Sequence, residues 1–142
     1  ADEGSIKKEV IQSQVFSGYE GQTTAVRAGD LLFISGLMAA EENGLPKNCS
    51  MDANQPYFGS IARNQMNNIL EKAAIICEAA GTSLENTVRI QQYHTNLNDF
   101  YGAYESWQGF LPGRALPFSA VRVPSLPIPG CSILADLWVY AP

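Results

Sequence analysis

Charged residues are scarce in this sequence, and basic residues are the scarcer kind. Charged residues make up 16% of the 142 positions, the formal net charge is −5, and the longest basic run is Lys7-Lys8. Because a nucleic-acid backbone is bound through a cationic stripe, the sequence argues against a nucleic-acid partner.

Long apolar runs are missing as well. The longest uninterrupted stretches, such as Leu31–Ile34 and Ala73–Cys77, are far shorter than the roughly 20 residues that cross a bilayer. No charged-then-apolar leader opens the sequence. We therefore expect a soluble protein with no membrane partner.

Ligands for a metal ion or a phosphate group are few. The sequence has one histidine, His94, and its three cysteines, Cys49, Cys77 and Cys131, are far apart, so no familiar metal-ligand spacing occurs. A glycine-rich phosphate-binding motif is absent too. We expect neither a metal nor another cofactor. An odd number of scattered cysteines fits reduced thiols and a cytoplasmic location.

The sequence does contain enough apolar residues for one core. Hydrophobic residues make up 46% of the chain, which is the length of an average domain and shows no internal repeat or linker. We therefore expect a single domain over residues 1–142.

Six segments have the β-branched and aromatic residues, or the alternation, that are typical of strands. These segments cover residues 6–14, 23–27, 31–35, 86–95, 118–123 and 132–139. Gly36 is expected to end the third strand. Residues 40–55 contain Asn43-Gly44 and Pro46 and are expected to form a surface loop, in which Cys49 and Met51 have no special role.

Two segments have helical patterns. Apolar residues recur at spacings of four and three from about residue 58 to residue 80, which predicts one long amphipathic helix with Gly81 as its C-cap. A second helix is expected through Phe110, with Asn98-Asp99 as its N-cap. The order of these elements predicts an α+β fold, a six-stranded mixed sheet with two helices on one face.

Four reactive residues have a structural and a functional interpretation. For His94, at the end of a predicted strand, we favour a solvent-facing or packed imidazole over a catalytic base. Cys77 lies on the apolar helix stripe and is expected in the core, whereas Cys131 lies in a turn and could be exposed. Asp136 interrupts the apolar last strand and either faces solvent, which we favour, or is an acid between subunits.

Four segments, in order along nearly the whole chain, resemble the RidA family, also called YjgF or L-PSP. They are Val26–Gly36, Gln65 with the helix that ends at Glu78–Gly81, Leu97–Phe100, and Ser119–Val123 followed by Leu126-Pro127. The resemblance implies a chorismate-mutase-like fold and a homotrimer with ligand clefts between neighbouring subunits.

The resemblance also implies an activity. Active family members hydrolyse reactive enamines and imines, such as 2-aminoacrylate, to a 2-keto acid and ammonia. An arginine in their cleft pairs with the substrate carboxylate, for which its bidentate fork is well suited. Some members have been described as ribonucleases, an activity that the acidic charge and the single histidine of this chain do not favour.

This sequence departs from the family pattern at the cleft arginine. That arginine directly precedes the serine of the fourth segment, and here the position is Phe118. The family's last-strand glutamate aligns with Ile133 or a neighbour, and its tyrosine before the first segment aligns with Gln22. Ser35 is retained, and it is either a ligand contact or simply a strand-end serine before Gly36.

Two other arginines could replace the missing one. Arg114 lies four residues before Phe118 and could reach the cleft from another direction, and Arg122 follows on the same strand; we favour surface positions for both. The candidate residues of the ligand cleft are therefore Gln22, Ser35, Gly36, Tyr104, Arg114, Phe118 and Ile133.

Two functional hypotheses follow. The first is an imine or enamine deaminase of the RidA type with an altered substrate, in which Ser35 or a main-chain group holds the attacking water. The second is a non-catalytic trimer that binds a small metabolite in the inter-subunit cleft, or a protein partner. A pocket lined by Phe118, Ile133 and Tyr104 would favour an apolar or aromatic ligand over a small anion. The sequence leaves open whether the chain is an enzyme.

Overall fold

The computed structural model describes residues 7–15, 23–42, 44–46, 49, 61–111 and 116–142. Within these residues the helices and strands are β1 (Lys8–Ile11), β2 (Ala25–Ala28), β3 (Leu31–Leu37), α1 (Ile61–Ala79), β4 (Thr87–His94), α2 (Phe100–Phe110), β5 (Phe118–Arg122) and β6 (Ile133–Tyr140). Short 3-10 turns at Leu84–Asn86 and Leu97–Asp99 precede β4 and α2.

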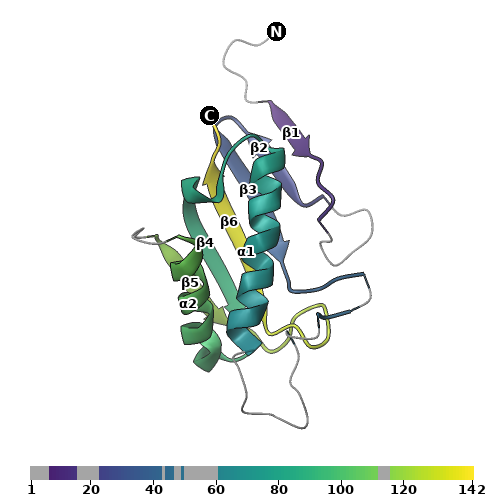
Figure 1. Ribbon diagram of the computed structural model, residues 1–142, viewed down its shortest axis with the longest axis vertical. Coiled ribbons are helices and arrows are strands. Elements are labelled where there is room, and N and C mark those ends of the chain that lie inside the picture. Colours follow the sequence, from purple (N-terminus) through teal and green to yellow (C-terminus); the bar gives the residue numbers. More distant parts are fainter. Residues whose placement is uncertain (1–6, 16–22, 43, 47–48, 50–60, 112–115) are drawn as a thin grey trace.

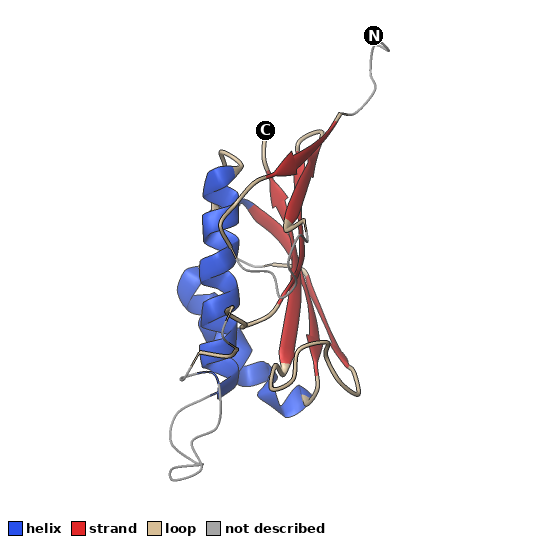
Figure 2. Ribbon diagram, turned by 90° about the vertical axis from the view of Figure 1, so that its right-hand side faces the viewer, coloured by secondary structure: helices blue, strands red, loops and turns tan. Residues whose placement is uncertain are grey.

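The strands form one mixed sheet in the order β1-β2-β3-β6-β4-β5. All neighbouring pairs are antiparallel except β4 and β5, which are connected through α2 and run parallel. Both helices pack on one face of the sheet, as Figure 1 shows from the front and Figure 2 from the side. The predicted α+β fold, with a six-stranded mixed sheet and two helices on one face, is confirmed. We call the face without helices the open face.

The hydrophobic core lies between the sheet and the helices. On β6, the alternate residues Ile133, Ala135, Leu137 and Val139 are buried, and they join the α1 residues Met66, Ile69, Ala73 and Ile76 in one cluster. Because successive side chains of a strand point to opposite faces, the intervening residues of β6, including Asp136 and Trp138, point to the open face. None of the described helices is both long enough and apolar enough to cross a membrane.

The end of α1 is as predicted. Gly81 has φ of 79°, and the amide of Thr82 donates to the carbonyl of Cys77 at 2.9 Å, which closes the last turn of the helix. The predicted start of this helix, at residues 58–60, lies outside the described residues.

The structure differs from the prediction in three details. β3 does not end at Gly36 but continues to Leu37, because a bulge between Ile34 and Leu37 takes the glycine into the strand. Asp99 is the N-cap residue of α2, as predicted, but its side chain makes no cap hydrogen bond; the side chain of Asn96 accepts from the Asn98 amide at the start of the 3-10 turn that leads into the helix. β1 is shorter than expected.

The segment predicted as a surface loop is partly buried. Cys49 is only 1% exposed, and its carbonyl accepts a hydrogen bond from the Gln65 side chain at 3.0 Å. The Gln65 amide nitrogen also donates to the carbonyl of Gly130 at 3.2 Å. Gln65 therefore ties two loops to α1, which the turn-rich sequence did not indicate. Met51 lies outside the described residues.

Candidate functional site

Ser35 and Gly36 line a hollow of about 450 Å³ on the open face. Its other lining residues come from β2, β3 and β6 and from the segment before β2, and they are Thr23, Ala25, Val26, Phe33, Ile34, Asp136 and Trp138. The register pairs Ile34 with Leu137 and Leu37 with Ala135. The bulge therefore places Ser35 and Gly36 beside Asp136 on the neighbouring strand.

The Ser35 hydroxyl faces the backbone before β2, where the Thr23 carbonyl lies 3.4 Å away and the Thr24 carbonyl is the nearer acceptor. It donates to the Thr24 carbonyl at 3.0 Å, across the β2–β3 boundary. Since a hydroxyl has one hydrogen and two lone pairs, Ser35 Oγ remains able to accept a hydrogen bond from a molecule in the hollow, such as a water.

Gly36 keeps the floor of the hollow close to β6. A Cβ at this position would lie 2.7 Å from Leu134 Cδ2, which is closer than real carbon contacts. A side chain at position 36 would thus have to displace the Leu134 side chain of β6.

Asp136 is the one charged residue among the described residues that line the hollow. It is half-buried on the open face, and burial raises the pKa of its carboxyl above the usual value of 3.8. On the other side of Asp136, Gln91 of β4 occupies the paired position. The sequence interpretation of Asp136 as a solvent-facing residue is right about the face, but it missed the hollow and the partial burial.

An aromatic pair forms the wall next to Asp136. The rings of Phe33 and Trp138 meet edge to face with centroids 5.8 Å apart, and each residue is 38% exposed. The guanidinium of Arg89 lies 5.4 Å from the centroid of the Trp138 ring and donates to Ser119 Oγ at 2.9 Å. The alternation of Asp136 and Trp138 along β6 was the sequence signal that could have placed both on one surface.

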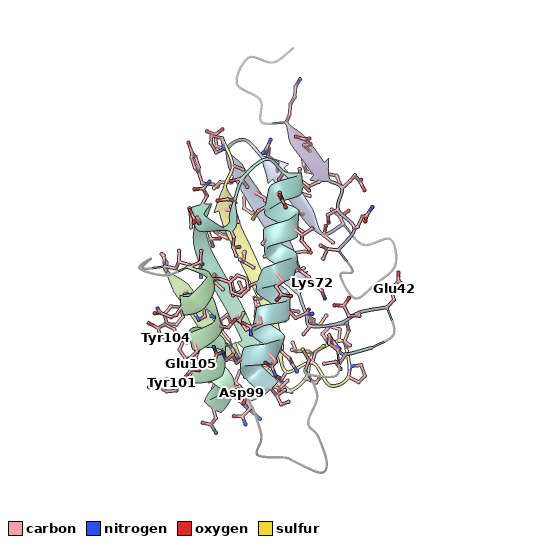
Figure 3. All side chains as sticks on the ribbon, in the orientation of Figure 1. Glu42, Lys72, Asp99, Tyr101, Tyr104 and Glu105 are labelled. Atoms are coloured by element: carbon pink, nitrogen blue, oxygen red, sulfur yellow. The ribbon has the colours of Figure 1, made fainter. Side chains whose placement is uncertain are left out.

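Phe118 and Tyr104 lie on the other side of the sheet. Phe118 pairs with the buried Ile90 across the β4–β5 ladder, so that its ring points toward the helix layer. It stacks on Phe100 of α2 at 5.3 Å and meets Trp107 edge to face at 5.4 Å. Tyr104, labelled on α2 in Figure 3, contacts both of these rings. We call Phe100, Tyr104, Trp107 and Phe118 the aromatic cluster.

The remaining candidates are scattered. Ile133 is fully buried in the core, and Arg122 is exposed at the end of β5 beside His94. Gln22 and Arg114 lie outside the described residues. Within the single chain, the structure therefore brings Ser35 and Gly36 together, and separately Tyr104 and Phe118, but it does not join the two groups.

His94 is packed rather than solvent-facing. It is fully buried, its Nε2 lies 2.9 Å from Oε1 of the buried Gln92, and its ring is near Phe100. Burial lowers its pKa below 6.5, although Asp99 acts in the opposite direction. Gln92 Nε2, His94 Nδ1 and Trp107 Nε1 are buried without a hydrogen-bond partner among the described residues. The sequence did not indicate that these buried polar atoms would gather next to Phe100.

The cysteines are poorly suited to act as nucleophiles. Cys77 is fully buried, and burial raises its pKa to about 11. Cys131, whose exposure the sequence left open, is only 5% exposed, and burial raises its pKa too. Because the thiolate is the reactive form, neither residue is activated. Among the described residues, no three histidines, cysteines or carboxylates lie close enough to hold a metal ion.

Lys72 is a buried cation that the sequence pattern did not single out. It projects from α1 (Figure 3), is only 6% exposed, and its ammonium donates to the carbonyls of Met38 and Ala40 and lies 3.8 Å from a Glu41 carboxylate oxygen. Burial lowers its pKa, which Glu41 partly offsets. These acceptors fit a lysine that fixes the chain after β3 against α1.

Comparisons with known proteins agree with the geometry. The family described as "Endoribonuclease L-PSP" matches residues 12–134. A RutC family protein of Pyrococcus horikoshii is 32% identical over 108 residues, which are 72% of this chain and 74% of that protein.

Solved structures share the fold. The RidA protein of the Antarctic bacterium Psychrobacter sp. PAMC 21119 superposes with a TM-score of 0.72 at 26% identity, covering 93% of this chain and 98% of that one. The Rid family protein YyfA of Yersinia pestis, of unknown function, gives 0.77 at 20% identity, covering 95% of this chain and 100% of that one.

Proposed function

Because the chain belongs to the RidA (YjgF, L-PSP) family, we propose that it hydrolyses a reactive imine or enamine, other than the family's small carboxylate-bearing substrates, to a carbonyl compound and ammonia. The observation that carries this proposal is the hollow in which the Ser35 hydroxyl and the Asp136 carboxyl come from neighbouring strands. Together they supply a water acceptor and a proton donor.

Asp136 acts first as the general acid. A carboxyl whose pKa is raised by burial holds its proton to a higher pH than an exposed aspartate. It transfers this proton to the imine nitrogen, which leaves an iminium beside the new carboxylate. The positive charge makes the imine carbon a better electrophile.

Water then attacks that carbon. Ser35 Oγ, whose own hydrogen is bonded to Thr24, accepts one hydrogen of the water, and the Asp136 carboxylate takes the other proton as the carbon–oxygen bond forms. The C=N π pair moves to nitrogen and gives a carbinolamine. Asp136 returns its proton to that nitrogen, the C–N bond breaks with its electron pair leaving on ammonia, and the hydroxyl proton passes to the Asp136 carboxylate as the carbonyl forms, which restores the acid. The balance is imine plus water to carbonyl compound plus ammonia.

A complete cleft requires a second copy of the chain. Ser35 and Gly36 lie on the open face, whereas Phe118 and Tyr104 lie toward the helix layer at the β5 edge. Phe118 is 46% exposed and Trp138 is 38% exposed, so both surfaces offer apolar area for burial. A homotrimer in which the aromatic cluster of one subunit closes the hollow of the next would unite the candidates, in a protein that we place in the cytoplasm.

One observation favours the alternative function. Phe118, at the position of the family's cleft arginine, packs between Phe100 and Trp107. No arginine is among the described residues that line the hollow and could take over the role of that arginine. A protein that had lost turnover but kept an aromatic cleft would bind a small metabolite without chemistry.

The test is ammonia release from imines generated in situ by amino-acid and amine oxidases. The native protein should accelerate release above the spontaneous rate, and Ser35→Ala should lower the acceleration. Ser83→Ala is the matched control, since Ser83 is exposed and its side chain caps nothing. Spontaneous rates for every imine with the native protein would reject the enzyme and leave the binding function.

A further inference from the structure

Among the described residues, the hollow on the open face is lined by an acid and by no base. Asp136 is the charged group among the lining residues that the structure describes. The neighbouring Arg89 is not part of the lining and is engaged by Ser119 and by the ring of Trp138. A ligand in the hollow therefore meets a carboxyl group, which becomes a negative charge once its proton has passed to the imine, where the family's substrates need a positive charge.

The aromatic wall adds to this preference. The faces of Phe and Trp rings carry negative electrostatic potential and attract cations. Phe33 and Trp138 stand next to Asp136, and both are more than a third exposed. The position of Arg89 over Trp138 shows that this indole already accommodates a cation on its ring.

We infer that the hollow selects imines without a carboxylate group, bound as the protonated iminium, with Asp136 as counter-ion and Phe33 and Trp138 as the apolar wall. This inference rests on the proposed function and names its substrate class. Imines of this class arise when primary amines, rather than amino acids, are oxidised.

The same features disfavour an imine that carries a carboxylate. In the half-buried hollow, that carboxylate would lose water and lie near Asp136, and like charges that are partly desolvated repel more strongly than in water. Discrimination here works by repelling the wrong ligand as well as by attracting the right one.

Two substrates that differ only in the carboxylate test the inference. An amine oxidase converts 2-phenylethylamine to its imine, and an amino-acid oxidase converts phenylalanine to the same imine with a carboxylate. The native protein should accelerate hydrolysis of the first imine at least about tenfold more than that of the second, and Asp136→Asn should remove the preference. Asp30→Asn is the control, because it changes net charge equally at an exposed turn.

Binding is measured separately from turnover. The unreactive 2-phenylethylammonium should raise the melting temperature of the native protein and of Asp30→Asn, but not of Asp136→Asn, whereas 3-phenylpropanoate should raise none of them. Asp136-dependent ammonium binding without turnover of either imine would reject the proposed function and keep the ligand class.

Turnover of both imines at equal acceleration would keep the function and overturn the inference. A preference for the carboxylate-bearing imine that is lost in Arg89→Gln would also overturn it, and would assign the carboxylate to Arg89.

Discussion

Replacing the buried pair Gln92 and His94 with leucines should show strong coupling. Both side chains are fully buried and share one hydrogen bond of 2.9 Å, while Gln92 Nε2 and His94 Nδ1 have no partner among the described residues. Either single change, Gln92→Leu or His94→Leu, removes the shared bond and leaves the other polar group wholly unpaired. Each should therefore cost about 1–3 kcal/mol.

The double variant should be as stable as the native protein or more so. Leucine is close in volume to both residues, so repacking costs little, and the change removes every unpaired atom of the pair. The double variant should thus be at least about 1 kcal/mol more stable than the sum of the two singles predicts.

Urea unfolding at about pH 7.5 and one fixed protein concentration measures this cycle. Since burial lowers the pKa of His94 below 6.5, the imidazole is neutral in the folded and unfolded states at that pH, and proton uptake does not contribute. A matched cycle, Gln91→Leu with Tyr93→Phe, uses a half-buried pair bonded at 2.7 Å and should couple by less than about 0.5 kcal/mol. Additive losses at Gln92 and His94 would refute the reasoning and would mean that these atoms find partners in solution.

Two further predictions concern Asp136 and Lys72. The folded state raises the pKa of Asp136 above 3.8, so the contribution of the protonated carboxyl to stability is full below that pH and is lost as pH rises through the folded pKa. Asp136→Asn should therefore unfold at a higher urea concentration than the native protein at about pH 7 but not at about pH 3.5. Equal urea midpoints at pH 7 would contradict this prediction. Lys72→Met should lower the free energy of unfolding by about 1–3 kcal/mol, because it leaves the carbonyls of Met38 and Ala40 without their donor. Lys8→Met, at an exposed position, is the control. An unchanged urea midpoint for Lys72→Met would show that those carbonyls have other hydrogen-bond donors.

Helical periodicity was the sequence signal that predicted the fold most reliably. The stripe of α1 and its glycine cap are local features, because spacing along the helix and one positive φ decide both. The end of β3 is not local. Gly36 looks like a strand terminator, yet pairing with β6 carries it through a bulge, and only the partner strand determines that outcome.

The candidate site was harder to predict than the fold for the same reason. The position of Phe118 on a strand followed from the sequence, but β5 is short, is at the sheet edge and shows no clear alternation of burial. Its face is set by the parallel pairing with Ile90. The hollow around Ser35 and Asp136 depends on the β3–β6 register, which spans about a hundred residues of chain.

The changed substrate preference of the cleft is tested most directly by deamination of freshly generated 2-aminoacrylate with the native protein beside Phe118→Arg. An arginine at position 118 can still stack on Phe100 and Trp107 and would supply a bidentate partner for a carboxylate. We expect little acceleration by the native protein and at least about tenfold more by the variant, since a hydrogen bond to a charged group contributes roughly 1.5–3 kcal/mol. Equal turnover of 2-aminoacrylate by both proteins would contradict the claim that Phe118 and Asp136 have changed the substrate of this cleft.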